Sequence, residues 1–111
     1  MCAYDEEKNI AKAISNIPKT IQGIDQIEIL VIDDGSTDKT IEIAKKHNVA
    51  RIISHKTNLG IGATFMTGIR NAISMNADVV VSIDADGEAN ADEIPDLITP
   101  ILNNQFDVVI G

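Results

Sequence analysis

The chain has 111 residues, a formal net charge of −8 and one cysteine. This length is enough for one domain with one core, and the negative charge argues against a partner that presents a nucleic-acid backbone. A single cysteine excludes an intramolecular disulfide and a metal site built from cysteines. No apolar run approaches the ~20 residues that span a bilayer, and no signal-peptide pattern is present. We therefore expect a soluble, cytoplasmic protein.

The first third of the chain predicts a helix followed by a buried strand. Asp5 is expected to cap the helix, whose apolar face is formed by Ile10, Ile14 and Ile17. Pro18 disfavours helical geometry at the residue before it and is expected to end the helix. The apolar run at residues 28–32 predicts a buried strand, and a polar turn follows it.

The rest of the chain continues the alternation of helices and strands. We expect a helix near 39–47, a short strand at 51–53, and a third helix after Gly60 and Gly62. Residues 79–83 are mostly β-branched and predict a strand buried on both faces. A fourth helix is expected over residues 94–102, with Pro95 in its first turn and Pro100 kinking or shortening it. The apolar run 106–110 predicts a last strand.

This alternation predicts the fold class. Repeated strand–helix–strand units favour an α/β fold with a mostly parallel sheet and helices on both faces. Residues 1–3 form only the end of a first strand, and the chain stops directly after the run 106–110. We therefore expect a domain that is truncated at both ends and belongs to a larger enzyme.

Two carboxylates, Asp84 and Asp86, follow the predicted strand 79–83. The carboxyl ends of strands in an open parallel sheet are where ligands bind. Two acidic side chains there can share a hard cation such as Mg²⁺ or Mn²⁺, which often bridges to substrate phosphates. This Asp-x-Asp pattern therefore predicts a metal-diphosphate site.

Three further segments accompany the Asp-x-Asp pattern: residues 3–7, residues 33–38 and residues 58–63. Together, these four ordered motifs resemble the family 2 glycosyltransferases, which have the GT-A fold, a Rossmann-like sheet. The resemblance covers essentially all 111 residues. Within the family it is nearest to the enzymes that transfer a sugar to polyprenyl or dolichyl phosphate.

The resemblance implies roles for individual residues. Tyr4 and Glu6 match residues that line the nucleotide base and ribose, although Cys2 stands where the family usually has proline and Asp5 where it usually has asparagine. Asp34 matches a carboxylate that hydrogen-bonds the nucleotide. The residues expected to bind the nucleotide are Ala3, Tyr4, Glu6, Asp34, Gly60 and Asp84. The residues expected to bind the metal are Asp84, Asp86 and, as a third ligand, Glu88.

The family also implies an inverting, single-displacement reaction that uses a nucleoside-diphosphate sugar and Mg²⁺ or Mn²⁺. Residues 1–111 would form the nucleotide-sugar-binding part, and the acceptor-binding part with any catalytic base would lie outside them. Alone, this part is expected to be inactive and to self-associate through an exposed strand edge. The parent enzyme could act at the cytoplasmic face of a membrane.

Other interpretations compete with this one. The segment 33–36 could be only a turn and helix cap, and His55 is expected to be a solvated surface residue. A haloacid-dehalogenase-like phosphatase also has Asp-x-Asp-Gly after a strand, but threonine or valine normally follows that glycine, where this chain has Glu88. A sugar nucleotidyltransferase would need a basic, glycine-rich loop in place of the acidic residues 5–7. A non-catalytic fragment that binds metal and nucleotide is the remaining alternative.

Overall fold

The computed structural model describes all of residues 1–111 and contains a parallel sheet. Its strands are β1 (Cys2–Ala3), β2 (Leu30–Asp33) and β3 (Arg51–Ser54), and they lie side by side in that order. Along the other edge of β1, Cys2 forms a parallel bridge with Asp84. The two-residue β1 therefore lies at the centre of the sheet, between β2 and the segment that ends at Asp84.

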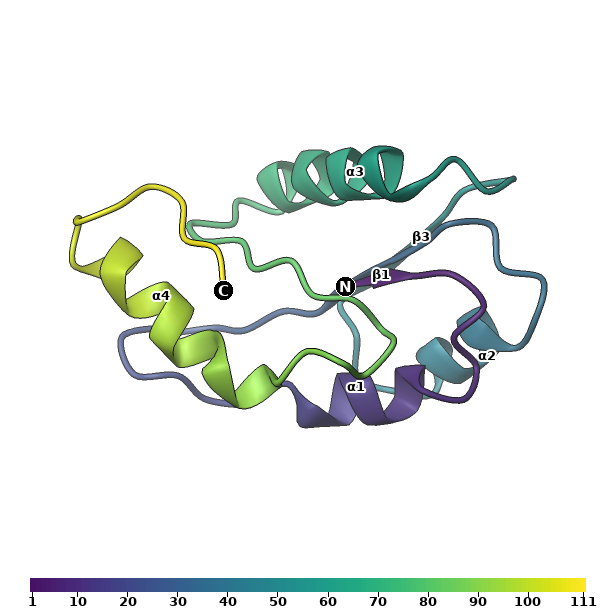
Figure 1. The fold of residues 1–111 in the computed structure, drawn as a ribbon, viewed down its shortest axis with the longest axis horizontal. Helices are drawn as coiled ribbons and strands as arrows, with labels where there is room; N and C mark the ends of the chain where they lie inside the picture. The colour runs from purple at the N-terminus through teal and green to yellow at the C-terminus, as the bar shows by residue number, and fades with distance from the viewer.

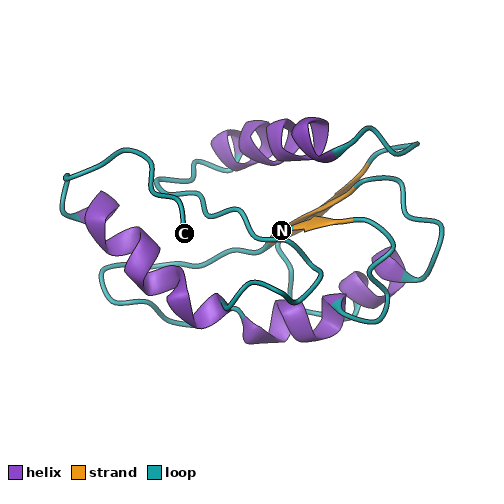
Figure 2. Cartoon of the chain, viewed as in Figure 1, coloured by secondary structure: helices purple, strands orange, loops and turns teal.

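Helices cover both faces of this sheet, as predicted (Figure 1). Helix α3 (Ile61–Ser74) lies on one face, and α1 (Ile10–Asn16), α2 (Thr40–Lys45) and α4 (Ile94–Leu102) lie on the other. A 3-10 turn, η1 (Ala91–Glu93), leads into α4. Long loops connect the short elements (Figure 2). None of the helices is both long and apolar enough to cross a lipid bilayer.

The core consists of two clusters on the face that carries three helices. In the first cluster, residues of β1, α1, β2 and α2 pack together, and Ile10 and Val31 are almost completely buried. In the second cluster, Ile94 and Ile98 of α4 pack against the segment 79–83 and the loop 17–24. Burial of these branched side chains stabilises the fold, by about 1.5–3 kcal/mol for each fully buried residue.

Helix α1 begins at Ile10, so the prediction that Asp5 caps it is wrong. Asp5 has a positive φ of 49°, and its carboxylate accepts a hydrogen bond from the N–H of Thr37 at 2.9 Å. A turn follows Asp5, in which the carbonyl of Glu6 accepts from the N–H of Ile10. The helix starts late because the chain before it bonds to a neighbouring loop. It ends as predicted, at the residue before the pair Ile17–Pro18.

The segment 79–83 does not form the predicted strand that is buried on both faces. It makes one bridge to β1, in which Cys2 N–H donates to Ile83 and Ala85 N–H donates to Cys2. Val79, Val81 and Ile83 pack toward α4, whereas Val80 and Ser82 alternate to the side facing α3 and are exposed. Only one face is covered because α3 does not close onto this segment.

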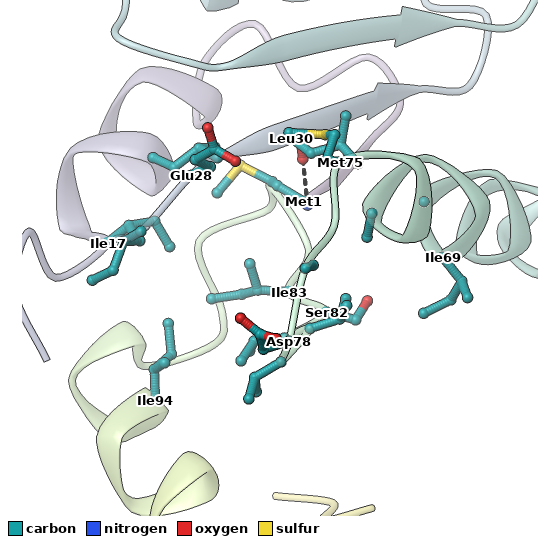
Figure 3. Close-up of a pocket in the computed structure, with 18 of the residues that line it drawn as sticks. Met1, Ile17, Glu28, Leu30, Ile69, Met75, Asp78, Ser82, Ile83 and Ile94 are labelled. Atoms are coloured by element: carbon teal, nitrogen blue, oxygen red, sulfur yellow. Dashed lines mark hydrogen bonds between the residues drawn. The ribbon is translucent and has the colours of Figure 1, made fainter. Parts of the chain in front are cut away.

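A largely apolar cavity of about 340 Å³ lies between α3 and the segment 79–83. Figure 3 shows it between α3, α4 and the sheet, with Leu30, Ile69, Met75 and Ser82 among its lining residues. Dispersion contacts are lost along such a void, because its lining atoms have no partners on one side. The region between α3 and the segment 79–83 is therefore loosely packed.

The predicted last strand, residues 106–110, is also not formed. The run pairs with no strand, and Phe106, Val108 and Ile110 are 61%, 75% and 91% exposed. An apolar run becomes a strand only where a neighbour supplies backbone hydrogen bonds, and none lies beside this one. The preceding helix, α4, has Pro95 in its first turn as predicted and continues for two residues beyond Pro100.

Candidate functional site

A second cavity, of about 360 Å³, lies at the carboxyl ends of β1, β2 and the segment 79–84. All six residues expected to bind the nucleotide line it, and so does Asp86. The complete lining is Cys2, Ala3, Tyr4, Glu6, Asp34, Asn58, Gly60, Ile61, Thr64, Asp84, Ala85 and Asp86. The fold thus gathers four segments that are far apart in the sequence at one sheet edge, where ligands bind in open α/β sheets. We call this space the edge cavity.

Asp34 is the most heavily hydrogen-bonded acid of the edge cavity. It is 4% exposed, and its Oδ1 accepts from the N–H of Leu59 at 2.9 Å while its Oδ2 accepts from the N–H of Gly60 at 2.9 Å. The ring of His55 contacts the same Oδ1 at 2.7 Å. Burial alone would raise the pKa of Asp34, but the hydrogen bonds from His55, Leu59 and Gly60 outweigh it and lower the pKa below its ordinary value. Asp34 is therefore an ionised group that holds the loop before α3.

His55 is not the solvated surface residue that the sequence suggested. Its side chain is 11% exposed, with Nδ1 on Asp34 and Nε2 2.9 Å from the Oγ1 of Thr67. Sequence reasoning missed this role because both partners are remote in the chain: Asp34 follows β2 and Thr67 lies in the middle of α3. The docking of α3 over the sheet creates the contact.

The loop before α3 passes very close to the turn after β2. A Cβ atom placed on Gly35 would lie 2.6 Å from the carbonyl carbon of Thr57 and 2.7 Å from the nitrogen of Asn58. Gly35 also has a φ of +78°, which favours glycine. Gly60, with a φ of +94°, then starts α3, and its carbonyl accepts from the Thr64 hydroxyl at 2.8 Å. These backbone conformations place Gly60 and Ile61 in the wall of the edge cavity.

Glu6 is held by a second pair of loops, and Tyr4 lies directly before the first of them. The carboxylates on one loop accept from N–H groups of the other: Asp5 from Thr37 and Glu7 from Lys39. In return, the N–H of Glu6 donates to the Thr40 hydroxyl at 2.9 Å. We call these reciprocal bonds between residues 5–7 and 36–40 the loop clasp. Because of the clasp, Glu7 is not a free surface residue.

Asp38 contributes to the clasp as a second acid with a perturbed pKa. It accepts from the N–H of Glu7 at 3.2 Å and from both the N–H and the hydroxyl of Thr40. Burial by itself would raise the pKa of Asp38, but these hydrogen bonds outweigh it and lower the pKa. The segment 33–36 forms a turn, in which the N–H of Ser36 donates to Asp33, but it does not cap α2, whose N-cap residue is Lys39. The same segment also supplies Asp34 to the edge cavity.

Asp84 and Asp86 both line the edge cavity, but the predicted third metal ligand, Glu88, does not. No group of three metal-ligating side chains comes together anywhere in the chain. Gly87 has a φ of +80° and turns the chain, so that Glu88 is exposed outside the cavity. The N–H of Glu88 donates to Asp86 Oδ1 at 2.9 Å, which leaves the other oxygen of Asp86 without a partner in the chain.

Two carboxylates on one cavity wall suit a hard divalent cation. Mg²⁺ usually keeps several waters and takes only one or two protein carboxylates together with substrate phosphates. Asp84 and Asp86 fit that requirement without Glu88.

Thr64 also lines the edge cavity, and sequence reasoning did not single it out. It is a buried residue of α3, and its position in the sequence gives no pattern that would reveal it.

Comparison with known proteins now places the chain in a family. The model of glycosyl transferase family 2 matches residues 1–111. The chain is 33% identical to a UDP-N-acetylglucosamine–dolichyl-phosphate N-acetylglucosaminyltransferase of Methanococcus voltae, over 98% of this chain and 48% of that protein. It is 33% identical to a dolichol-phosphate mannosyltransferase of Pyrococcus furiosus, over 97% of this chain and 30% of that protein.

A protein of unassigned function from Methanocaldococcus jannaschii is 37% identical over 98% of this chain and 43% of its own length. The chain thus spans about half or less of the length of these relatives. The matches nevertheless cover all four motifs and the edge cavity that they form. The chain belongs to glycosyl transferase family 2.

Proposed function

We propose that residues 1–111 form the nucleotide-sugar-binding part of an inverting glycosyltransferase. The donor would be a nucleoside-diphosphate sugar and the acceptor a polyprenyl or dolichyl phosphate, because two relatives are named for transfer to dolichyl phosphate or dolichol phosphate. The observation that carries the proposal is the edge cavity, since it joins Tyr4 and Glu6, the Gly60 turn, and the pair Asp84 and Asp86. The family match does not favour the phosphatase and nucleotidyltransferase alternatives.

The parts of the cavity suggest how a donor would lie. Tyr4, directly before the loop clasp, and Glu6, within it, would contact the base and ribose. The Gly60 turn brings backbone close to the ligand without a side chain in the way. Asp84 and Asp86, which also line the cavity, would hold Mg²⁺ or Mn²⁺ on the diphosphate. When bound, the cation would neutralise the charge that develops on the departing nucleoside diphosphate.

The acceptor chemistry requires little from these residues. An ionised phosphate oxygen is already a nucleophile, so transfer to a lipid phosphate does not need a general base. Attack at the anomeric carbon forms one bond as the bond to the diphosphate breaks, which inverts the configuration. A lipid acceptor would place the whole enzyme at the cytoplasmic face of a membrane. The acceptor-binding wall would be contributed by a further part of the enzyme.

Calorimetric titration with UDP and with GDP, each with and without Mn²⁺, tests this function. We expect one nucleotide to bind with Mn²⁺ and to bind much more weakly without it. Asp86→Asn should weaken the Mn²⁺-dependent binding by at least tenfold, because it removes a charged ligand. Asp25→Asn, on an exposed residue that does not line the edge cavity, is the matched control and should bind as the wild type does. Equal binding by the two variants would overturn the metal assignment.

A transfer assay tests the division of labour. Residues 1–111, given labelled nucleotide sugar, Mn²⁺ and a polyprenyl phosphate, should bind the donor but transfer no measurable sugar. Rapid transfer would show that no further part of the enzyme is needed. Absence of binding for both nucleotides would refute the donor site itself.

A further inference from the structure

One imidazole ring connects three separate elements beside the edge cavity. His55 follows β3, its Nδ1 lies 2.7 Å from Asp34 at the end of β2, and its Nε2 lies 2.9 Å from Thr67 in α3. The ring is mostly buried and does not line the cavity. It therefore cannot act on a donor directly, but it touches the acid that does line the cavity.

The hydrogen-bond chemistry fixes the position of the proton on this ring. An ionised carboxylate only accepts, so Nδ1 must carry a hydrogen that it donates to Asp34. In the neutral ring Nε2 is then an acceptor, and the Thr67 hydroxyl donates to it. The bond from Thr67 thereby stabilises the same tautomer that Asp34 requires.

The orientation of Asp34 in turn controls the cavity wall. Its two oxygens accept from the N–H groups of Leu59 and Gly60, one to each oxygen. Rotation of the carboxylate would break at least one of these bonds and release the turn that starts α3. The bond from His55 to Oδ1 opposes this rotation because it is a third hydrogen bond to the same carboxylate.

We propose that His55 is a positioning residue for the donor: with Thr67 it locks the Asp34 carboxylate in the orientation that sets the Gly60 turn. This inference rests on the proposed function for its effect on nucleotide binding. Its structural half, the locking of Asp34 and of the Leu59 and Gly60 amides, can be tested without any nucleotide.

Two substitutions of similar size separate the two bonds of the ring. The amide nitrogen of His55→Asn falls near Nδ1 and can still donate to Asp34, whereas that of His55→Gln falls near Nε2 and reaches toward Thr67. We expect His55→Asn to bind Mn²⁺ with UDP or GDP within about twofold of the wild type. His55→Gln should bind about tenfold more weakly, the effect of losing one hydrogen bond to a charged group. A purely structural role would make the two variants equal.

Nitrogen NMR of the wild-type chain provides a readout that needs no variant. We expect the proton of the neutral His55 ring on Nδ1, and we expect Thr67→Val to shift the Nε2 resonance, because it removes the hydroxyl that donates to Nε2, while Thr67→Ser preserves the wild-type signal. The amide resonances of Leu59 and Gly60 should move in His55→Gln and stay in place in His55→Asn.

A wild-type ring protonated on Nε2, or equal effects of the asparagine and glutamine variants on the two amides, would overturn the positioning role. Failure of the wild type to bind UDP and GDP would refute the proposed function instead. The NMR results would still decide whether His55 locks Asp34. The two failures are therefore distinguishable.

Discussion

Substitution of Gly35 by alanine tests the closest approach in the structure. The new Cβ would lie 2.6 Å and 2.7 Å from backbone atoms of Thr57 and Asn58, which cannot move aside as a flexible side chain would. The φ of +78° adds about 1–2 kcal/mol for any residue with a Cβ. Relief of the overlap adds about 1–3 kcal/mol. We therefore expect Gly35→Ala to reduce the free energy of unfolding by about 2–5 kcal/mol.

Two other glycines separate these contributions. Gly87 has a φ of +80° but no atom within 4 Å of the added Cβ, so Gly87→Ala should cost only about 1–2 kcal/mol. Gly62 is helical and equally open, so Gly62→Ala should stabilise the chain by about 0.5–1 kcal/mol. Urea unfolding followed by circular dichroism measures all three. A cost for Gly35→Ala no greater than that for Gly87→Ala would refute the argument from close approach.

The same substitution should also affect the edge cavity. Displacement of Asn58 would move the neighbouring N–H groups of Leu59 and Gly60 away from Asp34. Nucleotide binding, measured on the fraction that remains folded, should therefore fall in Gly35→Ala and remain unchanged in Gly62→Ala, whose site is exposed.

Three further predictions follow from features of the loops and the surface. Folding lowers the pKa of Asp34, so its contribution to stability is complete above the ordinary pKa of 3.8 and is lost as the pH falls from there through the folded pKa. In urea titrations at a series of pH values, the free energy of unfolding of Asp34→Asn should therefore fall less steeply at acid pH than that of the wild type. Asp5→Asn should leave the free energy of unfolding within about 0.5 kcal/mol of the wild type, because asparagine tolerates positive φ and keeps an acceptor for Thr37, whereas Asp5→Ala should cost about 1–2 kcal/mol. Exposed Val80, Phe106 and the unpaired edge of 79–83 should promote self-association, seen as a mass above that of the monomer in light scattering; a strictly monomeric chain would contradict this.

The sequence predicts the elements with strong local patterns. The strands near Leu30 and Arg51 and the helices that became α3 and α4 are all present, because apolar periodicity reflects burial directly. The cavity lining was also predictable, since acidic and glycine-rich turns after parallel strands must meet at one edge. Pro18 ends α1 for a purely local reason.

The errors have a common physical origin in partners that are distant along the chain. In the sequence Asp5 has the pattern of a helix cap, but in the fold its carboxylate accepts instead from the N–H of Thr37, 32 residues away. The run 79–83 has the composition of a buried strand, but composition does not say whether a second neighbour is present. His55 has no local pattern, and only the docking of α3 gives it Thr67 as a partner.

The central position of β1 has a consequence for the order in which the protein can fold during synthesis. Cys2 leaves the ribosome well before both of its neighbours in the sheet, Ile32 and Asp84. The sheet therefore cannot be completed until synthesis has passed Asp84. Until then one edge of β1 has no hydrogen-bonding neighbour. Completion of the sheet depends on contacts between residues far apart in the sequence, which form slowly.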